Sequence, residues 1–272
     1  MIRPVRLLIG AAPLVATLLL LEGCAGLPET LAPSLQARPE LFLDRLHAEE
    51  AAVRTLRGLA SVRYDGPAGR GSATQAIVVA LPDRVRLETL SPVGTAVLLL
   101  AIRGGDLTMY APTRKEYGVG PATRETLGRL ARISVPPGPL LRLLVGLPPL
   151  PIHPGDPRVK LTVEAAAVRV ESVDGVFWQR IWSSPDGVAP ERGELGEAAG
   201  LLLTFTFGDR RRLNDVLFPF AVHFDEAAMG TRLGIQYETV RLNEPLEAGL
   251  FEVPRPADGA TRILDLGAGS AP

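Results

Sequence analysis

The stretch RVRLETLSPVGTAVLLLAI, from Arg84 to Ile102, decides how this chain folds. Its first seven residues alternate between polar and apolar types, which is typical of a β-strand with one wet and one dry face. The Ser91–Gly94 turn then presents a single apolar residue, Val93, and eight residues without charge follow. This run is shorter than the roughly 20 apolar residues of a membrane-crossing helix, so the stretch predicts a strand, a turn and a second strand.

The second strand of this unit is apolar on both faces. Alternation separates its side chains into two sets, namely Leu98, Leu100 and Ile102 on one face and Val97, Leu99 and Ala101 on the other. We expect one set to line an apolar cavity and the other to pack beneath a helix. Two interpretations of the tip residue stay open, because Val93 either stays exposed to meet a membrane or an acyl chain, or folds back onto the protein.

The composition indicates a globular protein. The chain has 272 residues, of which 46% are hydrophobic and 22% are charged, enough for one large domain or two small ones. Aromatic residues make up 5%, so the core must consist mainly of Leu, Val, Ala and Ile. The formal net charge of −1 gives no support to nucleic-acid binding, which normally needs a basic surface.

Residues 1–24 carry the pattern of a bacterial secretion signal. Two arginines precede an uncharged stretch from Leu7 to Leu21, and a glycine then precedes Cys24, the only cysteine of the chain. The sequence Leu-Glu-Gly-Cys at this point resembles the lipobox of bacterial lipoproteins, although Glu22 stands where a small residue is usual. The resemblance implies that residues 1–23 are removed and that Cys24 is acylated. The alternative is an ordinary signal peptide or membrane anchor in which Cys24 is incidental.

The same resemblance implies a location and a domain organisation. Ala25 lacks the retention signal of inner-membrane lipoproteins, which implies lipid anchoring in the outer membrane with the protein facing the periplasm. Residues 24–38 contain Pro28 and Pro33 and little periodicity, so we expect a lipidated tether. We expect residues 39–256 to form one domain and residues 257–272 to form a flexible C-terminal tail.

The body of the chain predicts many short strands and three helices. PELFLDRLHAEEAAVRTL has helical spacing, and TRETLGRLARI and PGPLLRLLVGLPP predict two more helices. The last is almost wholly apolar, so it is buried all round or covers something apolar. About ten or eleven antiparallel strands with helices between them predict one curved sheet, which would enclose a lumen that the helices can cover.

The second half of the chain supplies aromatic candidates for the cavity. Alternation places two apolar sets on single strand faces: Leu201, Leu203, Phe205 and Phe207 in GLLLTFTF, and Val216, Phe218, Phe220, Val222 and Phe224 in DVLFPFAVHF. Phe205, Phe218 and Phe220 are therefore cavity or core candidates. Trp178 and Trp182 share one face of another strand, and either line a ligand cavity or fill the core.

The sequence offers no pattern of a catalytic or metal site. The histidines His47, His153 and His223 lie far apart and lack metal-ligand spacing. Neither a Gly-x-Ser-x-Gly elbow nor a phosphate-binding loop is present, so we expect no catalytic residue, no cofactor and no metal. The arginines at 210–212 could meet lipid headgroups or a protein, but a solvated turn whose charges guard against aggregation is favoured.

Several of these segments, in this order, resemble the LolB family of outer-membrane lipoprotein acceptors of Gram-negative bacteria. The likeness covers roughly Leu56 to Pro149 and rests on the strand–turn–strand unit, on LGRLARISVPPGP and on LLRLLVGLPP. The ending LNEPLEAGLFEVP looks more like LolA-type carriers. The resemblance implies a mainly β fold with inserted helices, namely a half-open, curved antiparallel β-barrel with a helical lid over an apolar cavity.

The resemblance also implies a function. The protein would accept acylated lipoproteins in its cavity from a periplasmic LolA-like carrier and help to deliver them to the outer membrane. The family exposes a leucine at the tip of the loop that matches Pro92, Val93 and Gly94, so this loop is the candidate contact with the membrane or acyl chains. Leu98, Leu100, Leu140, Leu141 and Leu144 are the aliphatic cavity or lid candidates.

We expect the protein to act as a monomer, with the acyl chains of lipoproteins or other lipids as its ligands and with no nucleic-acid partner. Two other interpretations of the sequence stay open. One is a tethered periplasmic binder or carrier of another lipid or hydrophobic ligand. The other is a structural or sensor module whose apparent cavity is only core.

Overall fold

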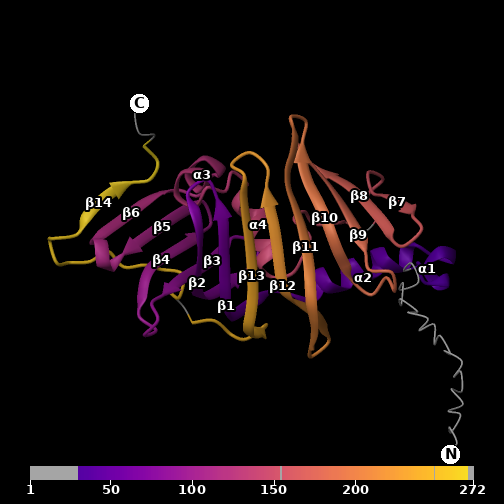
Figure 1. The fold of residues 1–272 in the computed structure, drawn as a ribbon, viewed down its shortest axis with the longest axis horizontal. Helices are drawn as coiled ribbons and strands as arrows, with labels where there is room; N and C mark the ends of the chain where they lie inside the picture. The colour runs from indigo at the N-terminus through magenta and orange to yellow at the C-terminus, as the bar shows by residue number, and fades with distance from the viewer. Residues whose placement is uncertain (1–29, 154, 248, 269–272) are drawn as a thin grey trace, which may run out of the picture.

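The computed structural model describes residues 30–153, 155–247 and 249–268. Within them, fourteen strands form one open, curved sheet (Figure 1). The strands are β1 (Thr55–Gly66), β2 (Gly69–Ala80), β3 (Arg84–Leu90), β4 (Ala96–Arg103), β5 (Asp106–Ala111), β6 (Glu116–Pro121), β7 (Lys160–Val163), β8 (Val168–Asp174), β9 (Phe177–Ser183), β10 (Pro190–Glu197), β11 (Gly200–Leu213), β12 (Val216–Glu226), β13 (Thr231–Leu242) and β14 (Arg262–Asp265). The mainly β fold with inserted helices is confirmed.

Two meanders make up this sheet. Strands β1 to β6 follow one another in space as in sequence, and so do β7 to β13. Antiparallel pairing of β1 with β13 joins the two meanders, with Tyr64 opposite Leu233. The sheet does not close, since β7 and β14 form its two edges.

The sequence predicted about eleven strands, and the structure adds three that were not predicted, namely β7, β10 and β14. Strand β10 has the sequence PERGELGE, in which Leu195 is the only large apolar residue, so no alternation is visible. It forms because its backbone pairs on both sides, with Leu195 opposite Gln179 of β9 and Leu203 of β11. Tertiary hydrogen bonding therefore supplies what side-chain patterning lacks.

The helices are α1 (Pro33–Ala37), α2 (Glu40–Ala52), the short 3₁₀ helix η1 (Pro112–Arg114), α3 (Arg124–Ala131) and α4 (Pro137–Leu144). In Figure 1, α2 and α4 are seen behind the strands. They pack on one face of the sheet, called here the inner face, where the side chains of Phe42 and Leu46 join those of α4 and the strands in one core. None of the described helices is long and apolar enough to cross a membrane.

Local sequence explains where α3 and α4 begin and end. The hydroxyl of Thr123 accepts a hydrogen bond from the backbone N–H of Thr126 and caps α3. Two prolines open α4, and Gly146 follows its end with a φ of +76°. A Cβ at Gly146 would lie 2.6 Å from Pro219 of β12, so glycine permits both the turn and the close approach.

Both ends of the domain differ from the sequence-based expectation. The signal segment, Cys24 and the first part of the tether lie outside the described residues. The rest of the tether is part of the fold, because Leu31 and Leu35 are 1% exposed and the Leu31 N–H donates to the carbonyl of Ala165. At the other end, residues 262–265 of the expected flexible tail form β14, which pairs in parallel with β6.

Candidate functional site

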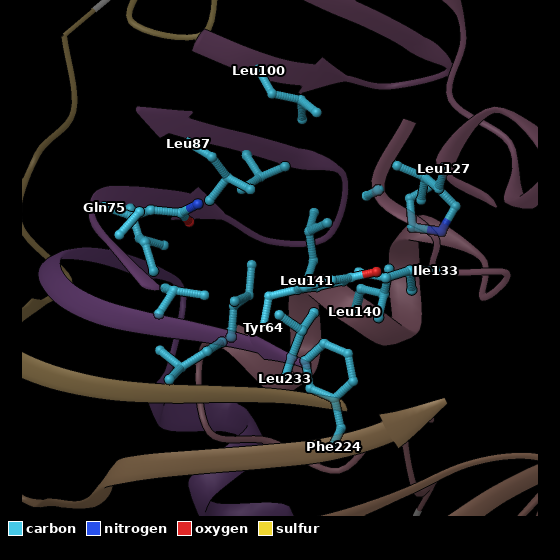
Figure 2. A pocket seen from close by; sticks show the side chains of 18 of the residues that line it. Tyr64, Gln75, Leu87, Leu100, Leu127, Ile133, Leu140, Leu141, Phe224 and Leu233 are labelled. Carbon is cyan, nitrogen blue, oxygen red and sulfur yellow. The ribbon is translucent and has the colours of Figure 1, made fainter. Parts of the chain in front are cut away.

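An apolar cavity of about 440 Å³ lies between the inner face of the sheet and helices α3 and α4. Figure 2 shows side chains from several strands and both helices converging on it. Its lining consists of Val62, Tyr64, Gly71, Ser72, Ala73, Gln75, Ile77, Val85, Leu87, Leu100, Ile102, Leu127, Ala131, Ile133, Pro137, Leu140, Leu141, Leu144, Phe224, Leu233 and Ile235.

Strand alternation produces the apolar floor of the cavity. On β3 and β4 the inward residues pair across the strands, with Leu87 opposite Leu100 and Val85 opposite Ile102. On β3 the outward neighbours Arg86 and Glu88 carry charge. Because side chains of a strand alternate between faces, one register places a continuous set of aliphatic groups against the cavity.

Helix α4 covers the cavity with one side and is held by the other. Leu140, Leu141 and Leu144 line the cavity, whereas the guanidinium of Arg142 lies 2.8 Å from the carboxylate of Glu50 on α2. Arg142 also donates to the carbonyl of Pro148 over 2.7 Å. Burial lowers the pKa of Arg142, and the Glu50 carboxylate opposes that shift.

The end of α4 is tied to the sheet as well. The Tyr237 hydroxyl of β13 donates to the carbonyl of Leu144 over 2.7 Å. Tyr237 is 1% exposed, and burial raises the pKa of its phenol. This bond satisfies one of the carbonyls that the end of a helix leaves without an intrahelical partner, so α4 sits at a defined height above the cavity floor.

The cavity is suited to binding hydrocarbon. Its volume falls in the range of roughly 300–1,000 Å³ that is typical of ligand pockets. Apart from Tyr64, Ser72 and Gln75, its lining side chains are aliphatic or aromatic. Each methylene transferred from water into such surroundings contributes about 0.8 kcal/mol, so affinity would come from chain burial. Among the described residues, no group of three or more His, Cys, Asp or Glu side chains is placed to hold a metal ion.

The structure separates the predicted cavity residues into two groups. Leu100, Leu140, Leu141 and Leu144 line the cavity. Leu98 is partly buried and packs against the core. The three phenylalanine candidates, Phe205, Phe218 and Phe220, belong to the solid core, where Phe218 packs edge-on against Tyr237 at 5.4 Å.

Several lining residues were missed by sequence reasoning, among them Val62 and Tyr64 of β1 and Leu233 and Ile235 of β13. Their signal was present, because each pair is spaced two residues apart in an alternating strand. What the sequence lacked was the pairing of β1 with β13, which joins strands about 170 residues apart and brings both pairs to one surface.

The two tryptophans lie on the opposite face of β9 from its core residues. Gln179 and Ile181 point into the core and are 1% and 0% exposed, so Trp178 and Trp182 project from the outer face. Each ring lies under an arginine, with the guanidinium of Arg192 4.1 Å from the Trp182 ring. Neither tryptophan lines the cavity, and Trp182 is buried with 7% of its surface exposed.

The Ser91–Gly94 turn holds Val93 away from the protein. Val93 is 86% exposed. The turn is fixed by the Gly94 N–H, which donates to the Ser91 carbonyl over 2.8 Å, and by the Ser91 hydroxyl, which accepts from the Thr95 N–H over 3.1 Å. Gly94 has a φ of +80°, which favours glycine. Exposure of the tip is therefore observed, and its contact with a membrane stays a prediction.

The outer face of β4 is covered by the C-terminal segment, and not by a helix as expected. Ala101 packs with Tyr117 and Val253 in a small cluster, and the Tyr117 hydroxyl donates to the carbonyl of Val253 over 3.0 Å. Phe251 covers the outer face of β2 in the same way. Leu246, Leu250, Phe251 and Val253 thus form an apolar strap across the outside of the first meander.

The sequence matches no protein-family model and no curated protein. Several solved structures are similar in fold. A LolA superfamily protein from Nitrosomonas europaea is 12% identical, with 78% of this chain and 96% of that chain covered and a TM-score of 0.51. A domain from Vibrio parahaemolyticus, provisionally named an outer-membrane lipoprotein-sorting protein domain, is also 12% identical, with 78% and 95% covered and a TM-score of 0.51.

A third is a DUF1329 family protein from Desulfovibrio piger, which is 11% identical, with 82% of this chain and 98% of that chain covered and a TM-score of 0.55. At these identities the likeness concerns the fold alone. A relationship to LolB in particular stays a prediction from the sequence motifs. The fold of this chain, an open, curved sheet with helices on one face, is thus similar to that of LolA superfamily proteins.

Proposed function

We propose that this protein is an outer-membrane lipoprotein that accepts the acyl chains of lipidated proteins in its apolar cavity and helps to deliver them to the membrane. The observation that carries the proposal is the cavity of about 440 Å³ beneath α3 and α4, with its almost wholly aliphatic lining. The lipobox-like sequence at Cys24 supports the anchoring, and the fold similarity supports the class of ligand.

The energetics suit a carrier more than an enzyme. A chain of about 16 carbons costs roughly 12 kcal/mol to expose to water, at about 0.8 kcal/mol per methylene. A carrier has to offset most of that cost and still release its cargo. The cavity offers many weak apolar contacts and few polar anchors, an arrangement that allows chains to slide in and out. We therefore propose no catalytic role.

The exposed turn is placed to assist transfer. Thr74 pairs with Leu90, so the turn that follows Leu90 leaves the sheet beside Ser72 and Ala73 of the cavity lining. An apolar tip at this point would insert into the acyl region of a membrane and shorten the aqueous path of a departing chain. Val93 buries less area than the leucine of the LolB family, so its membrane contact would be weaker.

The ligand class is tested by mass spectrometry of molecules that copurify with a soluble form lacking residues 1–23 and carrying Cys24→Ser. Acylated peptides are the expected result. Free lipids in their place would favour the alternative of a tethered carrier of another lipid. An empty cavity after purification from a lipid-rich extract would contradict both.

Delivery is tested in cells depleted of their own acceptor. The Val93→Glu variant should fold normally, because its side chain is exposed, and should fail to restore lipoprotein delivery. Val93→Leu is the matched control and should deliver at least as well as the wild type, since it enlarges the apolar tip. Normal delivery by Val93→Glu would show that the tip has no role.

A further inference from the structure

Three buried polar atoms without hydrogen-bond partners lie on elements that border the cavity. They are the hydroxyl of Tyr64, the Oγ1 of Thr231 and the Oε1 of Glu226. Thr231 is 0% exposed and Glu226 is 2% exposed. A buried polar atom without a partner costs about 1–3 kcal/mol, so three on neighbouring strands call for an explanation beyond packing.

Strand register brings the three residues to one end of the cavity. Tyr64, Leu233 and Phe224 line the cavity and form one row across β1, β13 and β12. Two residues further along, on the same face, Thr231 lies opposite Glu226. Because side chains two apart on a strand share a face, both project from the inner face just beyond the apolar lining.

Gly66 leaves room for the two hydroxyls to meet. A Cβ at Gly66 would lie 2.7 Å from the Tyr64 hydroxyl and 3.2 Å from the Oγ1 of Thr231. Both hydroxyls therefore lie close together over Gly66 of β1. Figure 2 shows Tyr64 reaching across the cavity among the aliphatic side chains.

Glu226 is held by one oxygen and leaves the other free. Its Oε2 accepts from the backbone N–H of Met229 over 2.6 Å, which fixes the carboxylate within the β12–β13 turn. The Met229 side chain lies 3.4 Å from where a Cβ of Gly128 on α3 would be. The turn thus approaches α3, which covers the same end of the cavity.

We propose that Tyr64, Thr231 and Glu226 form a head-group site that takes the first polar group of a neutral amphiphile whose chain lies in the cavity. The inference rests on the proposed function and names its ligand more closely. A carboxylate oxygen can only accept, and each hydroxyl can accept or donate. The group that satisfies all three is a hydrogen-bond donor, either an amide N–H or an alcohol O–H attached to the chain.

Other head groups fit this site less well than a neutral donor. A fatty-acid carboxylate or a phosphate would lie against Glu226, and like charges at short range in a buried place repel strongly. An ammonium group would pair with one carboxylate oxygen but would lose its hydration among aliphatic side chains. A methyl ester offers no donor and leaves the Glu226 oxygen unpaired.

The test uses the lipid-free protein and five probes with the same 12-carbon chain: dodecanol, dodecanamide, methyl dodecanoate, dodecanoate and dodecylamine. Each competes with an environment-sensitive fluorescent fatty-acyl probe in the cavity. The two neutral donors should bind about fivefold to tenfold more tightly than the methyl ester, the effect of roughly one hydrogen bond, and more tightly still than dodecanoate. Whichever of dodecanamide and dodecanol binds more tightly shows whether the natural ligand carries an amide-linked chain or an alcohol.

Three variants locate the effect. Thr231→Val keeps the side-chain shape and should remove most of the preference for donors over the ester. Glu226→Gln keeps an acceptor for the Met229 N–H, and should weaken the discrimination against dodecanoate. Thr74→Val is the control, because Thr74 lies on the opposite face of β2 from the cavity-lining Ala73 and Gln75, and it should leave both ratios unchanged.

The outcomes separate this inference from the proposed function. Equal binding of all five probes, or tightest binding of dodecylamine or dodecanoate, would overturn the head-group site and leave a chain-binding cavity. Failure of every probe to displace the fluorophore, or of the fluorophore to bind, would overturn both. If both single variants, Thr231→Val and Glu226→Gln, kept the donor preference of the wild type, head-group recognition would lie elsewhere and the proposed site would be wrong.

Discussion

The inner face of this sheet has two halves that share a sequence pattern but differ in what covers them. The first, called the cavity half, consists of β1 to β4 and β13 beneath α3 and α4. The second, called the filled half, consists of β8 to β11 and of β12 up to Val222, beneath α1, α2 and residues 145–152. Leu87 and Leu100 of the cavity half are only partly buried, whereas Leu195 and Leu203 of the filled half are 0% exposed.

The two halves differ in burial because residues 145–152, called here the connector, pack against the filled half. The connector side chains Leu147, Leu150 and Ile152 are at most 4% exposed and fill the space above the sheet that corresponds to the cavity in the other half. Gln179 of β9 fixes the connector, because its side-chain amide accepts from the Leu150 N–H over 3.0 Å and donates to the Leu150 carbonyl over 2.9 Å. An apolar sheet face thus becomes core or cavity according to its cover.

The largest expected effect is a contrast between matched leucines. Leu203→Ala should lower the free energy of unfolding by about 3–4 kcal/mol, because it opens a void in packed surroundings. Leu100→Ala should lower it by about 1 kcal/mol, since its side chain already faces a cavity. Urea denaturation of both variants measures the difference, and equal losses would show that the two halves are packed alike.

The second effect is a pH dependence in the filled half. Burial beneath the sheet raises the pKa of Glu49 on α2 to about 7, and the nearby Arg210 and Arg45 only partly oppose the shift. The folded state therefore holds a proton that the unfolded state releases above about pH 4.5. Stability should fall as pH rises from about 4.5 to 7, by up to roughly 3 kcal/mol, and then level off.

Glu49→Gln is the variant that isolates this carboxyl. It should lose most of the pH dependence and gain stability over the wild type at pH 8, with little difference at pH 5. Denaturation at both pH values measures the change. A wild type and a variant with parallel pH profiles would contradict the assignment to Glu49.

The third prediction concerns the anchor of the connector. Gln179→Leu should cost about 2 kcal/mol, because the N–H and carbonyl of Leu150 lose their partners in a buried place. Hydrogen exchange should then show faster opening of residues 145–152, and α3 should be unaffected. Uniform exchange across the whole domain would mean that the connector does not open independently.

The smallest effect on stability should come from filling the cavity half. Ala73→Phe places a ring in the cavity and should change the free energy of unfolding by less than about 1 kcal/mol, yet weaken binding of an acyl probe at least tenfold. Thr74→Phe, on the opposite face of β2, is the control and should bind normally. Normal binding by Ala73→Phe would show that chains are held elsewhere.

Sequence reasoning found the strand–turn–strand unit, α2 to α4 and four of the lining leucines, because each rests on local periodicity. It failed where a register shift changes the face of a side chain. Leu201 was expected to share a face with Leu203, but the pairing of β10 with β11 shifts next to it, so that Leu201 is 42% exposed and Leu202 is 5% exposed. One extra residue in a strand places the side chains that precede it on the opposite face of the sheet.

The sequence by itself determined most of the strands, helices α2 to α4, and which side chains are apolar enough to leave water. Only the tertiary structure decided which apolar faces become solid core and which enclose a cavity. The pairing of β1 with β13 places Tyr64 beside Thr231, and the connector fills one half of the inner face but not the other. The physical reason is that alternation shows only which face of a strand is apolar and will be buried. Which segment buries that face depends on contacts between residues far apart in the chain.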